Sequence, residues 1–321
     1  MSIERSPTVS IIMPTFDRLE FLEPAIASVF AQTFGDWELI IADDGSSDPA
    51  RAYLRRLQDH PRVQVIWMPH TGKPSIPSNA AIREARGEYL AFLDSDDVWL
   101  PEKLESQIAS LRRHPERGWS YTQFALIDSS GQRADPARTR RWPTPTGWIL
   151  EKLLEEETVI AQPSVVVSRS LLLELGAFDE ELVMCYDDEL WFRLAAHSQI
   201  DGVDEPLTLV RRHAQHSGSD IIAWRDRRRV FEKALFANRD PNLDATLRKL
   251  RARMSAGLAR SQAASGRRLD AFATLGASAP HCWRYPRSWV GALLAVVRAC
   301  APQSVRTLAR RYQHQRRLMR S

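Results

Sequence analysis

Four consecutive polar residues, Asp94-Ser95-Asp96-Asp97, directly follow a short apolar run at Tyr89–Leu93. Carboxylates at the end of a predicted strand suit a hard divalent cation, because Mg²⁺ and Mn²⁺ prefer oxygen ligands and often bridge carboxylates to substrate phosphates. The sequence therefore predicts a Mg²⁺ or Mn²⁺ site with Asp96 and Asp94 as ligands. A second interpretation, in which Asp97 caps the next helix, is compatible with the first.

Two other pairs of carboxylates could also do chemistry. Asp43-Asp44 lies in a turn after an apolar run, where an acceptor could take the N–H of a pyrimidine ring or the hydroxyls of a ribose. Asp187-Asp188 precedes an amphipathic helix in apolar surroundings, where a carboxylate with a raised pKa could act as a general base. For both pairs, a turn or helix cap is the alternative interpretation.

Three basic side chains are weaker candidates for binding phosphate. Lys73, in a Thr-Gly-Lys-Pro loop, could pair with a diphosphate, although a solvated loop lysine is equally consistent with this sequence. His213 and His216 could bind phosphate or metal, although isolated surface histidines are commoner.

Alternating strands and helices are predicted to position these residues. Apolar, β-branched runs at 9–13, 37–42, 63–68 and 89–93 read as buried strands, separated by segments with helical spacing. This alternation predicts an open, mainly parallel α/β sheet flanked by helices. Ligands bind at the carboxyl ends of such strands, and these ends carry Thr15-Phe16-Asp17, Asp43-Asp44 and the cluster at Asp94.

Charge divides the chain into two parts. From Arg225 to the C-terminus there are 22 Lys and Arg against 5 Asp and Glu, which leaves 22 basic and 35 acidic residues in 1–224. The second part reads as Arg-rich helical segments broken at Pro241, Gly266, Pro280 and Pro302. We therefore expect a domain at 1–223 and a basic, mostly helical C-terminal region at 224–321.

Cysteine usage and hydropathy favour a cytoplasmic protein. The 3 cysteines form no CxxC pair, so a disulfide framework or a structural zinc site is not expected. No signal segment precedes the first strand, and no stretch reaches the roughly 18 apolar residues that span a bilayer. For the nearest stretch, Trp289–Val297, a short buried helix is favoured over a membrane-surface contact.

Four ordered blocks resemble the family 2 glycosyltransferases, which have the GT-A fold. These blocks are VSIIMPTFDR, WELIIADDGSSD, GEYLAFLDSDDVWLPEKLE, and ELGAFDEEL followed by YDDELWFRLA. The resemblance runs from about Pro7 to Ser217 and implies an inverting transfer of sugar from a nucleotide-diphosphate sugar, with a UDP-sugar favoured. Cell-surface polysaccharide or glycolipid synthesis is the implied setting.

The resemblance also assigns residues. Thr15 and Phe16 would flank the base, Asp44 with its neighbour Asp43 would contact it, and Asp94 would lie near the ribose. Pro14 and Ser95 would be further contacts to the donor nucleotide. Asp96 would hold the metal, and Asp187, with Asp188 in reserve, would be the base. The chain departs from the family where Pro77-Ser78-Asn79 replaces Ala-Arg-Asn, and Lys73 could supply the missing charge. It departs again at Tyr186, where Glu is common.

Two other functions remain open from the sequence. A catalytically silent nucleotide-sugar-binding or scaffold protein would be expected to lack Asp96 or the base, and neither is missing. A nucleotidyltransferase would be expected to carry a glycine-rich loop after the first strand, where this chain has Pro14-Thr15-Phe16-Asp17-Arg18.

The expected partners are a nucleotide-sugar donor and a glycan or lipid-linked acceptor. The basic C-terminal region interleaves Arg with Leu, Ala and Val, as in Leu247–Leu258, which favours anionic lipid headgroups over nucleic acid. The enzyme would then lie peripherally on the inner face of the membrane. Simple solvation of this cationic face is the alternative.

Overall fold

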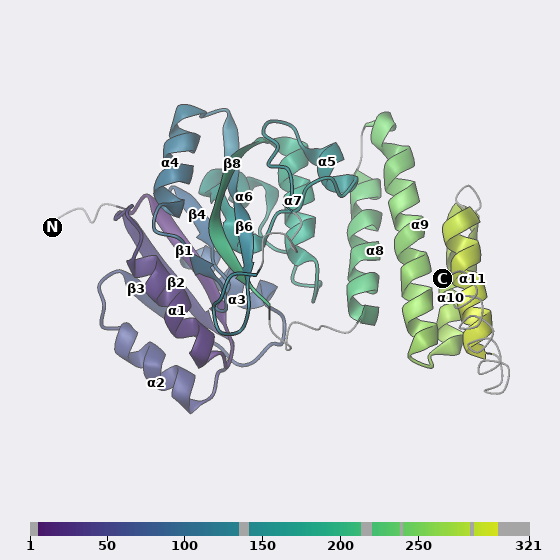
Figure 1. Ribbon diagram of the computed structural model, residues 1–321, viewed down its shortest axis with the longest axis horizontal. Helices are drawn as coiled ribbons and strands as arrows, with labels where there is room; N and C mark the ends of the chain where they lie inside the picture. The colour runs from purple at the N-terminus through teal and green to yellow at the C-terminus, as the bar shows by residue number, and fades with distance from the viewer. Residues whose placement is uncertain (1–5, 135–140, 213–219, 238–239, 283–285, 301–321) are drawn as a thin grey trace, which may run out of the picture. The chain divides into compact units, whose positions relative to one another are not determined.

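The computed structural model describes residues 6–134, 141–212, 220–237, 240–282 and 286–300. The chain divides into two compact units, Met1–His216 and Ser217–Ser321 (Figure 1). The predicted boundary between residues 223 and 224 falls inside helix α8 (Asp220–Ala237). The assignment of separate domains stays a prediction, because compactness does not show that either part folds alone.

An 8-stranded sheet runs through the described part of the first unit, in the order β3-β2-β1-β4-β7-β6-β8-β5. The strands are β1 (Val9–Thr15), β2 (Trp37–Asp43), β3 (Val63–Trp67), β4 (Tyr89–Phe92), β5 (Val98–Trp99), β6 (Arg117–Ile127), β7 (Val165–Ser168) and β8 (Gln199–Arg211). Strands β3, β2, β1 and β4 are parallel, as are β6 and β8, and the other neighbours pair antiparallel.

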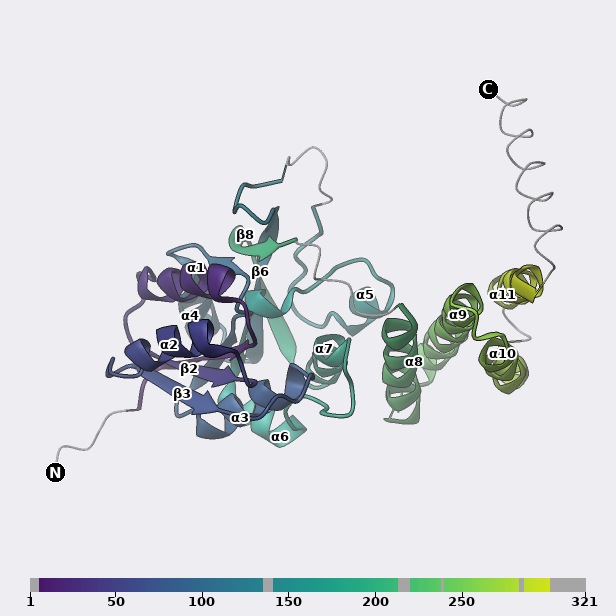
Figure 2. The same ribbon diagram turned by 90° about the horizontal axis from the view of Figure 1, so that it is seen from below.

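Helices cover both faces of this sheet. They are α1 (Leu19–Phe30), α2 (Asp48–Leu57), α3 (Ser75–Glu84), α4 (Lys103–Arg113), α5 (Leu150–Leu154), α6 (Arg169–Leu175) and α7 (Tyr186–His197), with a 3-10 turn at Gln162–Ser164. Figure 2 shows α1 and α4 on one side of the sheet and α3 and α6 on the other. The arrangement is a three-layer α/β/α unit.

The hydrophobic runs form strands because they can bury both of their faces. All seven residues of β1 are buried. Val9, Ile11 and Met13 pack into the core cluster that includes residues of α1 and α4, whereas Ile12 packs into the cluster of α3 and α7. This two-sided burial explains why the strand reads as a continuous apolar run rather than as an alternation.

The predicted α/β sheet is confirmed, and three of its details were not predicted. The sequence pattern predicts a helix at 79–86 that ends at Gly87, whereas helix α3 spans Ser75–Glu84. Neither the short β5 nor the long β8 was predicted. Strand β8 contains Gly202 and Pro206, which weaken a strand pattern locally, and its pairing with β6 has irregular register between Thr122 and Phe124.

The second unit contains α8, α9 (Pro241–Ala264), α10 (Arg268–Cys282) and α11 (Pro286–Cys300) among its described residues. Asp240 caps α9 by accepting a hydrogen bond of 2.9 Å from the Asn242 N–H, and Pro241 occupies the first turn. Helix α9 packs against α8, α10 and α11. Small residues permit this close approach, since a Cβ at Gly257 would lie 2.3 Å from the Trp224 ring.

The predicted breaks in this unit are partly confirmed. Pro241 begins α9, and Gly266, with φ +83°, separates α9 from α10. The expected break at Pro280 is wrong, because α10 continues to Cys282. A proline this close to the helix end removes only one late intrahelical hydrogen bond. Pro302 lies outside the described residues.

Trp289–Val297 is helical as predicted but only half buried. Ala292 and Val296 are fully buried in α11, whereas Val290, Leu294 and Val297 are 46%, 50% and 51% exposed. No helix in the described part of the chain is long and apolar enough to cross a bilayer.

Candidate functional site

A cavity of about 650 Å³ lies at the carboxyl ends of the parallel strands. Strands β2, β1 and β4 are neighbours in the sheet, so the residues that follow them meet at one edge. Seven residues predicted to contact a nucleotide line this cavity: Pro14, Thr15, Phe16, Asp44, Lys73, Asp94 and Ser95. Asp96 and Asp187 line it as well, whereas Asp43 and Asp188 do not.

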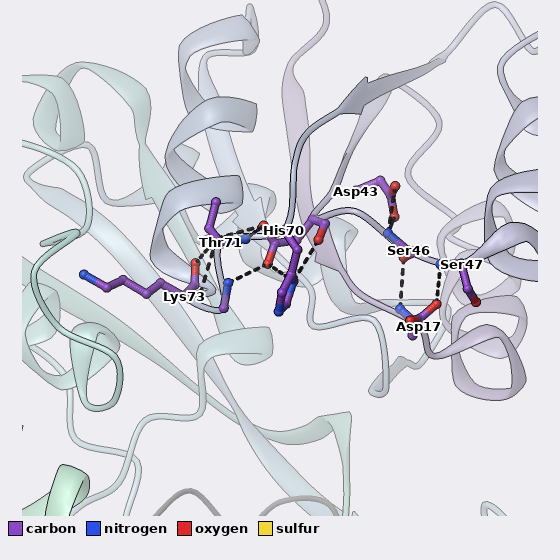
Figure 3. Close-up of polar contacts among 9 residues, drawn as sticks. Asp17, Asp43, Ser46, Ser47, His70, Thr71 and Lys73 are labelled. Carbon is purple, nitrogen blue, oxygen red and sulfur yellow. Dashed lines mark hydrogen bonds and ion pairs between the residues drawn. The ribbon is translucent and has the colours of Figure 1, made fainter.

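The carboxylate of Asp43 is fully buried inside the turn that follows β2. Both of its oxygens accept from the Ser46 N–H at 3.2 Å (Figure 3). The Arg51 Nε lies 3.4 Å from Oδ2. These contacts close the turn and give Asp43 a structural role. A direct contact between Asp43 and a nucleotide stays a prediction.

The carboxylate of Asp44 joins this turn to the loop after β3. Its Oδ1 accepts from the N–H and the hydroxyl of Thr71, both at 2.8 Å, and its Oδ2 accepts from the Gly72 N–H at 3.1 Å. The imidazole Nδ1 of His70 lies 3.1 Å from the same Oδ2. Asp44 therefore faces the cavity with its carboxylate already engaged by the 70–72 loop.

Asp17 joins the loop after β1 to the same turn. Its N–H donates to the Ser46 hydroxyl at 2.9 Å, and its Oδ1 accepts from the Ser47 N–H at 2.5 Å. Figure 3 shows these contacts beside the one that Asp43 makes. Hydrogen bonds from Ser47 lower the pKa of Asp17, which holds this link ionised. Asp17 adopts φ +46°, a conformation that non-glycine residues rarely take.

The hydroxyl of Thr15 and the ammonium of Lys73, both at the cavity, differ in their hydrogen bonds. The Thr15 hydroxyl is buried and has no hydrogen-bond partner among the described residues, so a bound ligand would satisfy it. The Lys73 ammonium instead donates to the Glu180 carbonyl at 2.8 Å. Lys73 borders the cavity, but its charge is directed to the backbone of the segment before α7.

Acidic side chains dominate one wall of the cavity. Burial, followed by the negative charges of Asp96 and Asp187, raises the pKa of Asp94 to about 8. Arg18 forms an ion pair with Asp96, and Gln162 donates to Asp94 Oδ1 at 3.0 Å. The three carboxylates are therefore close enough to repel one another, and a cation would relieve that repulsion.

Asp97 does not cap the following helix, contrary to one interpretation of the sequence. Helix α4 begins only at Lys103, after Glu102 at the N-cap position. Asp97 Oδ1 accepts from the Arg211 N–H at 2.7 Å, and the Arg211 Nε donates to the Asp96 carbonyl at 2.8 Å. Asp97 and Arg211 thus fix the cluster to the end of β8.

The first turn of α7 supplies the second wall. Cys185, at the N-cap position, has φ +57°, and Tyr186, Asp187 and Asp188 follow it. Of these two carboxylates, Asp187 lines the cavity and Asp188 does not, which favours Asp187 as a base. Burial, and then the charges of Asp94 and Asp187, raises the pKa of Tyr186, so its hydroxyl stays protonated.

Several residues of the site were missed from the sequence. Arg18, His70 and Tyr186 line the cavity. Gln162, the first residue of the 3-10 turn, donates a hydrogen bond to Asp94. Arg18 and His70 follow strand ends, which was the available signal. His213 and His216 lie outside the described residues.

The residues present fit a divalent cation. Asp94 and Asp96 offer hard oxygen ligands in one cavity, and their mutual repulsion favours a bound positive charge. No group of three or more His, Cys, Asp or Glu side chains within the described ranges is arranged to hold a metal alone. A cation here would need further oxygens, which phosphates and water can provide.

The sequence matches the model of Glycosyl transferase family 2 over residues 10–176. A putative teichuronic acid biosynthesis glycosyltransferase, TuaG of Bacillus subtilis, is 33% identical over 130 residues, which cover 40% of this chain and 51% of that protein. The UDP-Glc:alpha-D-GlcNAc-diphosphoundecaprenol beta-1,3-glucosyltransferase WfgD of Escherichia coli is 29% identical over 196 residues, covering 61% and 73%. The chain thus spans about half the length of the first of these relatives and spans 29% of a glycosyltransferase of Rickettsia bellii.

Solved structures share the fold at low sequence identity. S. aureus TarS 1–349 in complex with UDP has a TM-score of 0.59 and 19% identity, covering 91% of this chain and 80% of that chain. The mannosyltransferase PcManGT of Pyrobaculum calidifontis, in complex with GDP-Man and Mn²⁺, has a TM-score of 0.57 and 19% identity, covering 92% and 87%. The shared architecture is the GT-A fold.

Proposed function

This chain belongs to glycosyl transferase family 2, and we propose on that basis that it moves a sugar from a nucleotide-diphosphate sugar to an acceptor hydroxyl, with inversion at the anomeric carbon. The observation that carries this proposal is that Asp94, Asp96 and Asp187 meet in one cavity beside the buried Thr15 hydroxyl. Acidic groups from the strand ends and from α7 thus line one cavity of about 650 Å³.

We assign the roles of the residues from the family resemblance, among side chains that line the cavity. Thr15 and Phe16 border the base, Asp94 lies toward the ribose, and Ser95 is a further contact to the donor nucleotide. Asp96 and Asp94 hold Mg²⁺ or Mn²⁺, which supplies positive charge to offset that of the leaving diphosphate. Arg18, paired with Asp96, provides a second cation at the same wall.

Asp187 acts as the general base. It lines the cavity from α7, and its negative charge contributes to the raised pKa of Asp94. It takes the proton of the acceptor hydroxyl as the hydroxyl oxygen attacks the anomeric carbon and the diphosphate leaves. One displacement of this kind inverts the anomeric centre.

A UDP-sugar is the favoured donor, and a lipid-linked sugar the favoured acceptor. TarS is solved with UDP, and the name of WfgD gives UDP-Glc and a diphosphoundecaprenol-linked sugar. We place the reaction in cell-surface polysaccharide or glycolipid synthesis, at the cytoplasmic face of a membrane. A GDP-sugar is the alternative donor, as PcManGT is solved with GDP-Man.

The second unit supplies a means of reaching such an acceptor. Residues 271–321 contain 9 Arg and no Asp, Glu or Lys. Phe272 on α10 and Val290, Leu294 and Val297 on α11 are exposed apolar side chains in the described part of this stretch. Exposed apolar residues in a stretch that carries arginine but no Asp or Glu are typical of segments that bind anionic membrane surfaces.

Binding and turnover measurements on three variants test the proposal. Isothermal titration should show UDP binding that tightens with Mn²⁺, and Asp96→Ala should remove the dependence on Mn²⁺. Asp187→Asn should lower the rate of UDP release from a UDP-sugar and a polyprenyl-diphosphate-linked acceptor by about 10²–10⁴-fold while sparing UDP affinity. Asp188→Asn should retain most turnover, and the exposed Asp59→Asn is the control.

The outcomes separate the candidate functions. Metal-dependent UDP binding without turnover in any arm would point to a catalytically silent sugar-nucleotide-binding protein. No binding of UDP or GDP, with or without Mn²⁺, would refute the donor site altogether.

A further inference from the structure

The imidazole of His70 lies within the candidate donor cavity and makes two directional contacts there. It stacks on the Phe16 ring with centroids 4.0 Å apart and an interplanar angle of 21°. Its Nδ1 lies 3.0 Å from the Asp44 carbonyl oxygen and 3.1 Å from Asp44 Oδ2. Both oxygens are acceptors, so Nδ1 carries the proton and donates. The imidazole, a planar nitrogen ring, is thus held in the cavity by stacking on Phe16 and by the hydrogen bond that its N–H donates to Asp44.

The hydrogen-bonding capacity of Asp44 is fully used in this arrangement. A carboxylate offers about four acceptor positions. Two are taken by Thr71 on Oδ1 and one by the Gly72 N–H on Oδ2. The His70 Nδ1, which is hydrogen-bonded to the Asp44 carbonyl, lies 3.1 Å from Oδ2 and covers the fourth. A base N–H can therefore reach this carboxylate only if one of the four donors withdraws.

Two of the four donors can withdraw without moving the backbone, the Thr71 hydroxyl and the His70 ring, and the one that also covers Phe16 is His70. Its side chain is 49% exposed, whereas two of the other donors are main-chain N–H groups of the loop. The backbone of His70 lies close to Gly45, since a Cβ added at Gly45 would be 2.7 Å from the backbone nitrogen of His70. Rotation of the imidazole about its own side-chain bonds leaves this contact intact. In Figure 3, His70 lies between Thr71 and Lys73 on one side and Ser46 on the other.

We propose that His70 holds the place of the donor nucleobase and is displaced by it. Rotation of the ring outward frees the face of Phe16 and one acceptor position of Asp44 at the same moment. A base that stacks on Phe16 and donates a ring N–H to Asp44 replaces both contacts that are lost. This inference rests on the proposed donor site and adds a residue that competes with the donor base for Phe16 and Asp44.

The exchange selects among bases by their ring nitrogen. Uracil and guanine present a ring N–H on the edge that pairs with other bases, and this group can take over the bond to Asp44. Cytosine and adenine present a ring nitrogen acceptor at that position, which would face the lone pairs of the carboxylate. Displacement of His70 by CDP or ADP therefore leaves Asp44 with an unmet acceptor and weakens binding.

His70→Ala is the direct test, measured by isothermal titration with UDP and CDP in the presence of Mn²⁺. Removal of the competing ring should tighten UDP binding by a factor on the order of tenfold, the combined size of a stacked pair and a hydrogen bond at a half-exposed position. The preference for UDP over CDP should persist, because Asp44 is unchanged. His114→Ala, which alters a partly exposed histidine outside the cavity, should leave both affinities as in the wild type.

A second measurement uses the wild-type protein. The Cε1–H resonance of His70, assigned by its loss in His70→Ala, should move toward the position of a solvated histidine as UDP is added, because the ring leaves Phe16. An unchanged resonance at saturating UDP would overturn the proposal.

The binding data distinguish two kinds of failure. Weaker or equal UDP binding by His70→Ala would show that the ring is a platform for the base or a bystander, and would overturn this inference while the donor site stands. If neither wild type nor variant binds UDP or GDP, the donor site and this inference fall together.

Discussion

The carboxyl group of Asp94 shares its surroundings with those of Asp96 and Asp187, and its pKa is raised from 3.8 to about 8. Because this pKa is higher in the folded protein than in the unfolded chain, protonation of Asp94 stabilises the folded state. The stabilising effect of that proton is complete below about pH 4 and is lost as the pH rises toward 8. Without divalent metal, the free energy of unfolding should therefore fall over this range.

Asp94→Asn should remove much of this pH dependence. The amide keeps an oxygen to accept the Gln162 hydrogen bond but carries no charge. At pH 8 without metal, the variant should be more stable than the wild type by at least about 1 kcal/mol, the size of a single pKa unit. Urea denaturation at pH 5 and pH 8 measures this. A variant that is less stable than the wild type at pH 8 would contradict the account.

The same substitution should have the opposite effect when ligands are bound. Mn²⁺ with UDP stabilises the wild type by mass action, and loss of one metal ligand should reduce that gain. An aspartate with a purely structural role would not be expected to give a substitution that stabilises the protein without metal and lowers its stability with Mn²⁺ and UDP.

Individual residues of the site were only partly predictable from the sequence. Local pattern placed Asp43 and Asp44 in one turn, and Asp187 and Asp188 in one helical turn, but it could not tell which member of each pair faces a cavity. That depends on the last ladder pairs of β2 and on the rotation of α7, which long-range packing sets. The place of His70 depends on a contact with Phe16, 54 positions away in the printed sequence.

At the scale of elements, α4 carries an unusual group at its start. Lys103 is fully buried, and its Nζ has no hydrogen-bond partner in the described part of the chain, although it lies 4.0 Å from the centroid of the Trp99 ring. Burial lowers the pKa of this amine well below 10.5. The unfolded chain therefore binds more protons than the folded one between the lowered pKa and 10.5, and stability should rise with pH across that window.

Lys103→Met should remove this rise and stabilise the protein at pH 7. Methionine keeps the packing of the straight chain against Trp99 and needs no hydrogen bond. The expected gain at pH 7 is about 1–3 kcal/mol, shrinking toward pH 10, as measured by urea denaturation at both values. Lys152→Met, at an exposed position, is the control. Equal destabilisation by Lys103→Met at both pH values would show that the amine makes a contact essential to α4.

The elements differed in how well the sequence predicted them. Strands β1 to β4 were predicted because each is an apolar run bounded by turn residues. Strand β8 was not predicted, since its middle residues are exposed and it contains Pro206. Its existence depends on hydrogen bonds to β6, more than 70 positions earlier, and no local pattern reports a partner at that distance.

At the scale of the whole molecule, we expect the chain to bind anionic membranes through the second unit. The intact protein should sediment with vesicles of phosphatidylcholine mixed with phosphatidylglycerol and not with phosphatidylcholine alone. Binding should weaken between 0.1 M and 1 M salt, as the Debye length falls from about 10 Å to 3 Å.

Substitutions on α11 test the apolar part of this contact. Val290→Ser with Leu294→Ser removes two half-exposed apolar side chains and should lower vesicle affinity about tenfold or more at every salt concentration. Leu173→Ser, which alters a 50% exposed leucine of the first unit, is the matched control. Vesicle affinity that does not change with lipid charge, salt concentration or the two α11 substitutions would refute a membrane role for this unit.

Asp17 and Asp44 connect the three loops of the proposed donor site. Asp17 connects the loop after β1 to Ser46 and Ser47, and Asp44 connects that turn to Thr71 and Gly72. For enzyme engineering, this makes the loops a single exchangeable module. A graft of one loop from a relative with a different donor would leave a buried acceptor or donor unmatched in the other two. Donor preference in this scaffold should therefore change through coordinated replacement of segments that are distant in sequence.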